Sequence, residues 1–294
     1  MLKGIIVINA FLRPKESVAQ AERLKSEFES RGVEVQIISD GFIKSAIVGD
    51  KPVTDFFDVN FCVYLDKDKY LSQMLEKVGI RLFNSHKAIR VCDDKAETYL
   101  ALSGAGIRIP DTMFGFLSYS EEDAIPDGYV DGVIKKLSLP LIVKESYGSM
   151  GKGVYLANSR TELRRLMEKL KNKPHLYQKL IGDGKGKDLR VIVIGGKAVA
   201  YYERKNDGDF RSNIGIGGVG RKIPVPKKFI AAAENCAKLI GLDYCGVDIL
   251  YDGTSPVVCE VNSNAFFKEA EKVTGVNIAA LYADHVIKIM TKGV

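Results

Sequence analysis

The sequence of 294 residues contains no tryptophan and only three histidines. His86, His175 and His285 lie far apart and have neither metal-ligand spacing nor a nucleophilic partner motif, so no histidine-based metal site or catalytic triad is predicted. No apolar run approaches the ~18 residues that a transmembrane helix needs. The apolar stretch 5–12 is interrupted by Asn9 and lacks a small-residue cleavage site, which predicts a buried strand rather than a signal peptide.

The chain also has few cysteines and only a small excess of charge. The five cysteines are odd in number, show no CxxC spacing and mostly lie inside apolar runs, which is typical of reduced core residues in a cytoplasmic protein. The 43 lysines and arginines exceed the 37 aspartates and glutamates, giving a net charge of +6. That excess suits an anionic small ligand such as a nucleotide, and equally an ordinary basic surface. It is too small to require nucleic acid, so neither a nucleic-acid nor a membrane partner is expected.

The remaining composition is that of a globular protein. Apolar residues make up 46% of the chain and charged residues 27%, and the length corresponds to about two domains or one large composite domain. Up to about residue 90, apolar runs at 3–9 and 33–38 flank apolar residues at helical spacing. Further apolar runs follow at 61–65 and 80–83. This strand–helix–strand pattern predicts a small open α/β domain with a parallel sheet.

Beyond residue 93, strands and amphipathic helices alternate with glycine-rich loops. In the central part we expect a helix carrying Lys95, strands at 112–116, 140–145 and 176–181, a loop through Pro126, Gly128 and Gly132, a glycine-rich loop at 146–154 and a helix capped by Ser159. In the last third we expect two strands that meet at Gly195–Gly196, a glycine-rich loop at 206–220, a helix at 230–240, a hairpin of 246–251 and 257–262, and a helix from Asn277.

Two glycine-rich segments have the composition of phosphate-binding or dinucleotide-binding loops. In the loop 148–153, glycines let backbone N–H groups approach an anion, although a flexible connection between strands is the alternative. It is not a Walker A loop, because Ser146 and Gly153 stand where that motif needs Gly and Ser or Thr. The pattern Gly-x-Gly-x-x-Gly at 215–220 follows no buried strand and leads to prolines, so we reject a dinucleotide site there.

Three oxygen-bearing side chains lie in the predicted hairpin. Glu260 and Asn262 are two residues apart and share one face of a strand, and a turn centred on Thr254 places Asp248 opposite Glu260. Carboxylates inside apolar strands are costly unless a cation compensates them. Carboxylate and amide oxygens suit Mg²⁺ or Mn²⁺, which also bind nucleotide phosphates. Ion pairing of these carboxylates with Lys or Arg is the alternative.

Four cationic side chains are candidates for contacts with phosphate. Lys95 is expected at a helix start and Lys144 at the end of an apolar strand; the alternative for each is an ordinary surface lysine. Arg211, in the segment 209–213, and the nearby Arg204 bring positive charge into a glycine-rich loop. Such a loop is able to close over a reacting phosphoryl group and stabilise its charge, whereas a merely solvated loop is the competing interpretation.

Taken in order, these segments resemble the ATP-grasp superfamily and, within it, the RimK-like glutamate and amino-acid ligases. The likeness runs over nearly the whole chain, through Asp94-Lys95, Lys144 with its glycine-rich loop, 178–181, 188–190, 209–213, 246–248 and 260–262. It implies an α/β (α+β) ATP-grasp fold. An N-terminal open α/β (pre-ATP-grasp) domain at 1–92 would precede a central lobe at 93–181 and a C-terminal lobe with the metal site at 182–294.

The resemblance also implies roles for individual residues. ATP would lie between two sheets, with its base read largely through the backbone near Lys179 and Leu180, and Asp188 would contact the ribose or another part of the nucleotide. The implied nucleotide-binding set is Lys95, Lys144, Gly148, Ser149, Gly151, Gln178, Lys179, Leu180, Ile181, Asp188, Arg211, Ser212 and Asn213. Arg204, Arg211 and Asn213 would be catalytic. Asp248, Glu260 and Asn262 would hold two Mg²⁺ or Mn²⁺ ions, with Glu260 bridging them.

The implied activity is ligation of a carboxylate to an amine through an acyl phosphate. One substrate would be glutamate or another amino acid, and its partner an amino acid, a peptide or a small metabolite. Gly215 and Ile216 carry no charge where ligases that extend acidic protein tails tend to have basic residues. The resemblance further implies a dimer or tetramer. Two rival functions are a non-catalytic ATP-binding regulatory module, disfavoured by the complete set of metal ligands, and an NAD-dependent oxidoreductase, which rests only on the rejected glycine pattern.

Overall fold

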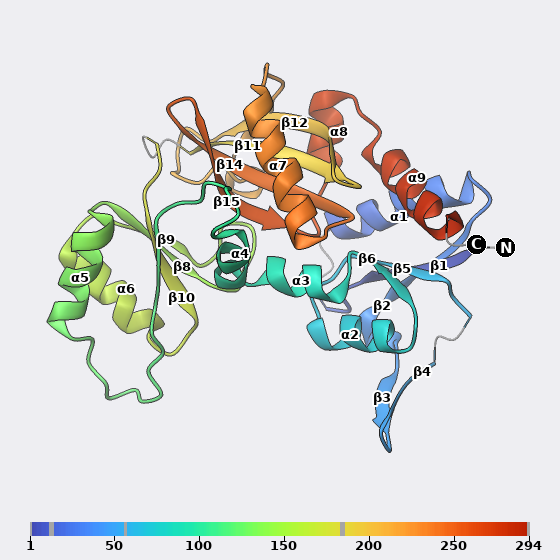
Figure 1. Ribbon diagram of the computed structural model, residues 1–294, viewed down its shortest axis with the longest axis horizontal. Helices are drawn as coiled ribbons and strands as arrows, with labels where there is room; N and C mark the ends of the chain where they lie inside the picture. The colour runs from blue at the N-terminus through green and yellow to red at the C-terminus, as the bar shows by residue number, and fades with distance from the viewer. Residues whose placement is uncertain (1, 12–14, 56–57, 183–185, 293–294) are drawn as a thin grey trace.

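The computed structural model describes residues 2–11, 15–55, 58–182 and 186–292. In this part of the chain, the strands form three larger sheets and one two-stranded hairpin. The three sheets are spread along the long axis of the molecule, with the third sheet in the chain lying between the other two (Figure 1). None of the described helices is long and apolar enough to cross a membrane.

The first sheet is parallel and has the strand order β2-β1-β5-β6. It and its helices comprise β1 (Lys3–Ile8), α1 (Lys15–Glu29), β2 (Glu34–Ser39), β5 (Phe61–Tyr64), α2 (Lys69–Lys77), β6 (Arg81–Phe83) and α3 (His86–Asp93). The predicted strand–helix–strand pattern is confirmed. The hairpin of β3 (Ser45–Val48) and β4 (Lys51–Thr54) has no counterpart among the predicted elements. Its strands are four residues each and only Thr54 among their residues is buried, so their side chains show no alternation of buried and polar residues.

The second sheet is antiparallel and has the order β7-β10-β8-β9. Its elements are β7 (Thr112–Phe114), α5 (Asp127–Leu137), β8 (Leu141–Glu145), β9 (Val154–Ala157), α6 (Arg160–Leu170) and β10 (His175–Lys179). The predicted loop through Gly128 and Gly132 is wrong, because 127–137 form α5. Val130, Val133 and Leu137 are buried at helical spacing, while both glycines face solvent.

The third sheet is antiparallel and has the order β13-β12-β11-β14-β15. Its elements and the helices near it are α4 (Lys95–Leu102), β11 (Lys187–Ile194), β12 (Lys197–Lys205), β13 (Val219–Arg221), α7 (Lys227–Ile240), β14 (Tyr244–Asp252), β15 (Ser255–Asn262) and α8 (Lys268–Thr274). Leu189, Val247 and Ile249 belong to an apolar cluster with residues of α7 and α4. Residues between them, such as Arg190 and Asp248, therefore point to the opposite face. The predicted strands and hairpin of this region are confirmed.

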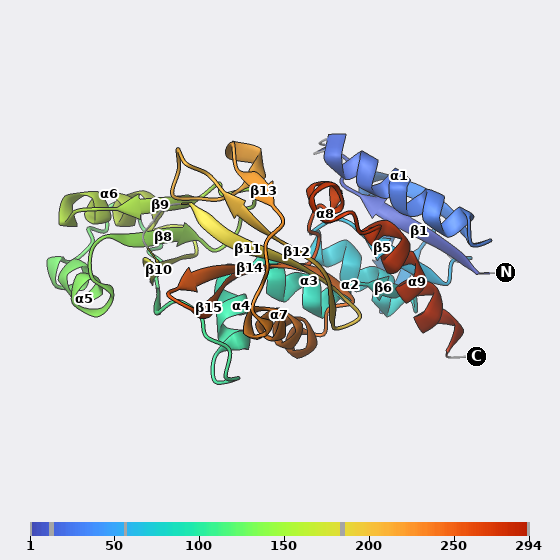
Figure 2. The same cartoon turned by 90° about the horizontal axis from the view of Figure 1, so that it is seen from above.

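The last helix, α9 (Ile278–Thr291), returns to the first sheet. It follows the N-cap Asn277, as predicted, and lies beside α1 (Figure 2). Tyr282 of α9 shares one apolar cluster with Phe28 and Phe83 of the first sheet and its helices. The boundaries at 92/93 and 181/182 fall between the three sheets, and as domain boundaries they stay predictions.

A buried amide joins the first sheet to the third. Asn84, which follows β6, donates from Nδ2 to the carbonyl oxygens of Tyr244 and Ser263, each at 2.8 Å. Its Oδ1 accepts from the backbone N–H groups of Asp243 and Tyr244. Asn264 adds a bond from Nδ2 to the carbonyl oxygen of Leu65 at 2.7 Å. Because Ser263 and Asn264 directly follow β15, the first sheet fixes the position of the carboxyl end of that strand.

Two carboxyl groups lie together at the carboxyl end of the parallel sheet. Asn9 donates from Nδ2 to Asp40 Oδ2 and to Asp66 Oδ1, both at 3.3 Å. Asp66 Oδ2 is buried and has no hydrogen-bond partner among the described residues. Burial and the neighbouring Asp40 raise the pKa of Asp66 to about 6.

We expect the substitution Asp66→Asn to stabilise the fold at pH 7.5. A raised folded pKa means that Asp66 favours folding while protonated, so its contribution is complete below about pH 4 and is lost as the pH rises through 6. Asparagine carries no charge to bury, and the expected gain is ~1–2 kcal/mol at pH 7.5, after allowance for solvent screening, and near zero at pH 4. Urea denaturation at both pH values measures it. Asp50→Asn, at an exposed turn, is the control and should change little; an equal effect of both variants would contradict a buried charge at Asp66.

Candidate active site

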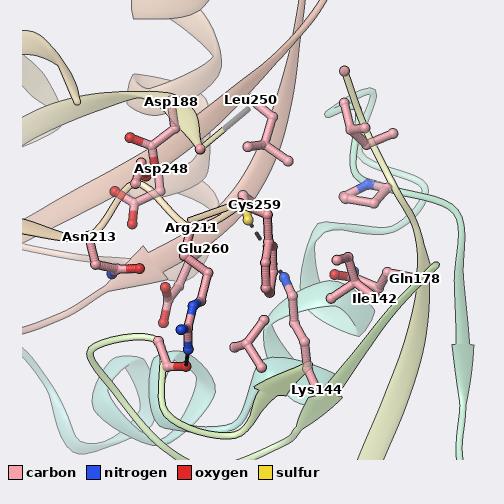
Figure 3. A pocket seen from close by; sticks show the side chains of 18 of the residues that line it. Ile142, Lys144, Gln178, Asp188, Arg211, Asn213, Asp248, Leu250, Cys259 and Glu260 are labelled. Atoms are coloured by element: carbon pink, nitrogen blue, oxygen red, sulfur yellow. Dashed lines mark hydrogen bonds between the residues drawn. The ribbon is translucent and has the colours of Figure 1, made fainter. Parts of the chain in front are cut away.

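A cavity of about 390 Å³ lies between the second and third sheets. Ile142 and Gln178 line it from one sheet, and Asp248, Leu250 and Glu260 line it from the other (Figure 3). Of the predicted site residues, only Asn262 does not line this cavity. Those that do are Lys95, Lys144, Gly148, Ser149, Gly151, Gln178, Lys179, Leu180, Ile181, Asp188, Arg204, Arg211, Ser212, Asn213, Asp248 and Glu260.

Two buried lysines carry positive charge to the cavity. Lys95, the first residue of α4, donates from Nζ to the carbonyl oxygen of Gly148 at 2.8 Å, and burial lowers its pKa. Lys144 Nζ, on β8, lies 3.3 Å from the Tyr99 hydroxyl and 3.6 Å from Cys259 Sγ. Burial opposes the charge of Lys144, but Cys259 and Tyr99 keep its pKa above the ordinary value. Each lysine is only 7% exposed, so neither is an ordinary surface lysine, and no described carboxylate forms a salt bridge with either.

The glycine-rich loop is tied to the loop that follows β12. Gly148, Gly151 and Gly153 have φ values of 125°, 75° and 72°, a region of backbone conformation that favours glycine. Arg211 donates from Nη1 to the carbonyl oxygen of Gly151 at 2.8 Å. Asp209 accepts from the Nε and Nη2 of the same guanidinium. The two loops are thereby joined at the cavity.

The end of β10 brings backbone groups to the cavity. The Gln178 side chain is held in place, since Nε2 donates to Thr112 Oγ1 at 2.8 Å and Oε1 accepts from the Tyr99 hydroxyl at 3.3 Å. The backbone N–H of Lys179 donates to the carbonyl oxygen of Asp111 at 3.0 Å. That N–H is therefore occupied within the protein, and recognition of a base through the backbone near Lys179 and Leu180 stays a prediction.

Four charged side chains form a chain of ion pairs on the cavity face of the third sheet. Arg204 on β12 donates from Nε to Asp188 Oδ1 at 2.8 Å, and its Nη2 bonds to Asp188 Oδ2 and lies 2.8 Å from Asp248 Oδ2. Arg190 on β11 donates from Nε and Nη2 to the two carboxylate oxygens of Asp248. All four are buried. Burial alone would raise the pKa of Asp248, but Arg190 and Arg204 hold it below its ordinary value.

This chain of ion pairs realises one alternative that the sequence leaves open. Arg204 lies near the glycine-rich loop, as expected, on β12, which extends to Lys205, and Asp188 holds its guanidinium in place. Asp248 is paired with arginine, which is the alternative that the sequence leaves open. Asp248 is therefore able to bind a metal ion only if its carboxylate oxygens keep a lone pair that the arginines do not use.

Asp248 lies opposite Glu260, as predicted, but for a different reason. The turn of the hairpin lies between the paired residues Asp252 and Ser255, so an unbroken ladder would place Asp248 opposite Cys259. A β-bulge at Cys259 adds one residue to β15 and restores the pairing with Glu260. Gly246 lies opposite Asn262 in the same ladder. The bulge thus brings the three predicted metal ligands to one face.

The donor set fits a hard divalent cation. Within the described residues, no hydrogen bond or ion pair engages the side chains of Glu260 and Asn262. Asp248 Oδ1 accepts only from Arg190 Nε among these residues, which leaves a lone pair free. Two carboxylates and an amide oxygen suit Mg²⁺ or Mn²⁺. Among the described side chains there is no cluster of three or more His, Cys, Asp or Glu placed to hold a metal, so Asn262 is needed for a third protein ligand.

Several residues at this site were not predicted, and three of them, Arg190, Tyr99 and Cys259, contact predicted ones. Arg190 had a signal, since a residue two positions after Asp188 on a strand shares its face. Tyr99 lies one helical turn after Lys95 and so shares its side of α4. Nothing in the sequence marks Cys259, which acquires its position from the bulge. The rejected glycine pattern at 215–220 overlaps a 3₁₀ turn and β13 and opens no helix.

The chain is similar to a known protein family, to characterised relatives and to solved structures. Residues 92–286 match the family model of the RimK-like ATP-grasp domain. N-acetylaspartylglutamate synthase A of Homo sapiens is 32% identical over 256 residues, covering 83% of this chain and 63% of that protein, so the chain spans less than two thirds of its length. A probable alpha-L-glutamate ligase of Shewanella loihica is 32% identical over 297 residues and 95% of each protein. D-alanine–D-alanine ligase from Bacillus anthracis, in a crystal structure with ATP, has a TM-score of 0.74 at 16% identity, over 99% of this chain and 98% of that one.

We expect Asp248→Asn to destabilise the fold by ~3–5 kcal/mol, because it leaves Arg190 and Arg204 short of buried negative charge. Glu260→Gln removes a carboxylate that no described side chain pairs with, so it should change the free energy of unfolding by less than ~1 kcal/mol. Urea denaturation at pH 7.5 compares the two variants. A loss in Asp248→Asn no larger than in Glu260→Gln would contradict the ion-pair chain.

Proposed function

The chain belongs to the RimK-like ATP-grasp family, and from this premise we propose that it is an ATP-dependent carboxylate–amine ligase. The expected α/β ATP-grasp fold, with an open α/β unit before a two-lobed region, is confirmed by the likeness to solved ATP-grasp structures. The observation that carries the proposal is the cavity lined by Lys95, Lys144 and Glu260. Neither lysine forms a salt bridge with a described carboxylate, and the charge of Glu260 favours the charged form of both. This arrangement suits a ligand that brings both phosphate and a divalent cation.

ATP is proposed to occupy the cavity between the two sheets. Ile142 and Leu250 line it from opposite sheets and offer apolar contacts to the base, next to the backbone of Leu180. Lys95 and Lys144 offer two positive charges to the phosphates. The glycine-rich loop adds backbone N–H groups.

The predicted metal ions also belong to this proposal. Asp248, Glu260 and Asn262 are the residues that would hold Mg²⁺ or Mn²⁺. When bound, such an ion neutralises phosphate charge and stabilises the transferring phosphoryl group. The presence of two ions and the bridging role of Glu260 stay predictions.

The proposed reaction has two steps. A carboxylate oxygen of the acid attacks the γ-phosphorus of ATP as its bond to the bridging β–γ oxygen breaks, giving an acyl phosphate and ADP. The amine nitrogen then attacks the acyl carbon, the C–O bond to phosphate breaks, and loss of a proton from nitrogen leaves an amide. The chain supplies no covalent nucleophile. Its lysines and Arg211 would stabilise phosphate charge, and the hydrogen bond of Arg211 to Gly151 joins the two loops beside the cavity.

One substrate is proposed to be glutamate or another amino acid. This is supported by the names of relatives, a synthase of N-acetylaspartylglutamate and a probable alpha-L-glutamate ligase. An amino acid, peptide or small metabolite would be the second substrate. Location in the cytoplasm and assembly into a dimer or tetramer are proposed with the function and rest on the sequence alone.

The first test is release of ADP and phosphate from ATP and Mg²⁺ with pooled amino acids, short peptides and acidic metabolites, with product masses read in parallel. We expect release that depends on one pool and a product mass equal to two substrates minus water. Glu260→Gln, which should fold normally, is expected to abolish that release. ATP binding without turnover in every pool would instead favour a regulatory ATP-binding module.

A second test concerns Lys144. Lys144→Met retains most of the side-chain volume beside Tyr99 but removes the charge, so we expect the Kd for ATP to rise about 10-fold or more. Equilibrium binding of ATP measures the change. Lys173→Met, at an exposed position with its Nζ 3.5 Å from Glu145, is the matched control and should bind as the unsubstituted protein does. Equal affinity of all three proteins would remove Lys144 from the nucleotide site.

A further inference from the structure

The hydroxyl group of Tyr99 connects the second and third sheets beside the nucleotide cavity. Tyr99 is on α4 and is only 2% exposed. Its hydroxyl lies 3.3 Å from Lys144 Nζ on β8 and 3.3 Å from Gln178 Oε1 on β10. It also donates to the backbone carbonyl oxygen of Cys259 on β15. One oxygen atom thus contacts three residues that line the cavity.

The hydroxyl acts as a hydrogen-bond donor and as an acceptor at the same time. Burial raises the pKa of Tyr99 to about 12, so the hydroxyl keeps its proton at neutral pH. The Cys259 carbonyl oxygen and Gln178 Oε1 are acceptors, and the proton is directed to them. The ammonium of Lys144 only donates, so the hydroxyl oxygen accepts from it. A phenylalanine at this position would lose all three contacts.

One of these contacts supports the β-bulge. Cys259 is the extra residue of the bulge and pairs with no residue of β14. A carbonyl oxygen inside the protein that lacks a partner costs free energy, and the Tyr99 hydroxyl supplies that partner. Glu260 follows directly and lies opposite Asp248 only because of the bulge. The hydroxyl therefore holds the segment of β15 that brings Glu260 to the cavity.

The same hydroxyl restricts the ammonium of Lys144. Lys144 Nζ also lies 3.6 Å from Cys259 Sγ (Figure 3). Of its three N–H groups, the hydroxyl and the thiol engage two, and no described residue engages the third. Because the three N–H groups are arranged tetrahedrally, fixing two of them also fixes the direction of the third. A charge on a flexible four-carbon chain thereby acquires a defined position.

We propose that Tyr99 is a positioning residue whose hydroxyl, by bonding to Lys144 and to the bulge at once, sets the place of the Lys144 ammonium relative to Glu260. This inference rests on the proposed ligase function, in which Lys144 binds phosphate and Glu260 binds a metal ion. The metal ion and the phosphates are bound to each other in that ligand, so the lysine and the carboxylate need a matching separation. They belong to different sheets, which the Tyr99 hydroxyl joins at this point.

The first experiment is a double-mutant cycle on the binding of ATP in the presence of Mg²⁺. Tyr99→Phe retains the ring and removes the hydroxyl, and we expect the Kd for ATP to rise about 10-fold. In Lys144→Met no ammonium remains to be positioned, so adding Tyr99→Phe should raise the Kd by less than about threefold. Tyr119→Phe, at a 96% exposed position, is the control and should bind ATP as the unsubstituted protein does. Equal factors in both backgrounds would indicate a merely structural hydroxyl and overturn the proposal.

The second experiment examines the bulge without a nucleotide. Of the five cysteines, Cys259 alone is not fully buried, so alkylation by iodoacetamide, read from peptide masses, reports on it. Loss of the hydroxyl releases the Cys259 carbonyl, and we expect Cys259 to be alkylated about fivefold faster in Tyr99→Phe than in Tyr119→Phe or the unsubstituted protein. The four buried cysteines should stay unmodified in all three proteins, which shows that they are folded. An unchanged rate at Cys259 would contradict the support of the bulge by Tyr99 and overturn the proposal.

The two experiments also distinguish this inference from the function on which it rests. Faster alkylation of Cys259 in Tyr99→Phe, in a protein that does not bind ATP, would retain the link between Tyr99 and the bulge and remove the nucleotide function. Binding of ATP with equal factors in the two backgrounds would retain the nucleotide site and remove Tyr99 as a positioning residue.

Discussion

The site depends on the neutralisation of Asp248 inside the protein. Asp248 is 2% exposed, and a lone charge at such a position would cost several kcal/mol. Arg190 and Arg204 remove that cost, and Asp188 in turn compensates Arg204. Each partner is on the same sheet but on a different strand from Asp248, so the ion pairs form only when β11, β12 and β14 are in register. The neutralisation of Asp248 therefore requires the strand order and register that the third sheet has.

Two local features convert this sheet into a site with defined geometry. The bulge at Cys259 shifts β15 by one residue, so that Glu260 rather than Cys259 lies opposite Asp248. The amide of Asn84 then holds Tyr244 and Ser263, at the start of β14 and just beyond β15. The carboxyl end of β15 is thus fixed from outside its own sheet. Side chains that are held in place in this way lose less conformational entropy when they bind a cation or a substrate.

The sequence predicted the features that depend on local pattern and missed those that depend on distant pairing. The parallel βαβ unit and the hairpin of 244–262 follow from apolar periodicity and turn residues, and both are present. The loop expected at 126–132 is a helix because Val130, Val133 and Leu137 outweigh two glycines. The sequence predicted the pairing of Asp248 with Glu260 from a turn centred on Thr254, whereas the turn is centred between Gly253 and Thr254. The predicted pairing is correct only because the bulge at Cys259 shifts β15 by one residue. The ion pairs of Arg190 and Arg204 with Asp248 were not predicted, because they join strands that are neighbours in space and not in sequence.

The three sheets are not joined with equal strength. Between the first and third sheets lie a buried amide with four hydrogen bonds and an apolar cluster that contains Phe83, Tyr244 and Tyr282. Across the cavity, the described links are polar: Arg211 and Lys95 donate to backbone carbonyl groups of the glycine-rich loop, Tyr99 donates to Gln178, and Lys144 approaches Cys259. Polar groups that separate are able to bond to water or a ligand instead, whereas packed aromatic residues lose their contacts outright. Nucleotide entry is therefore expected to proceed by a hinge movement of the second sheet, while the first and third sheets move together and keep the charged face intact.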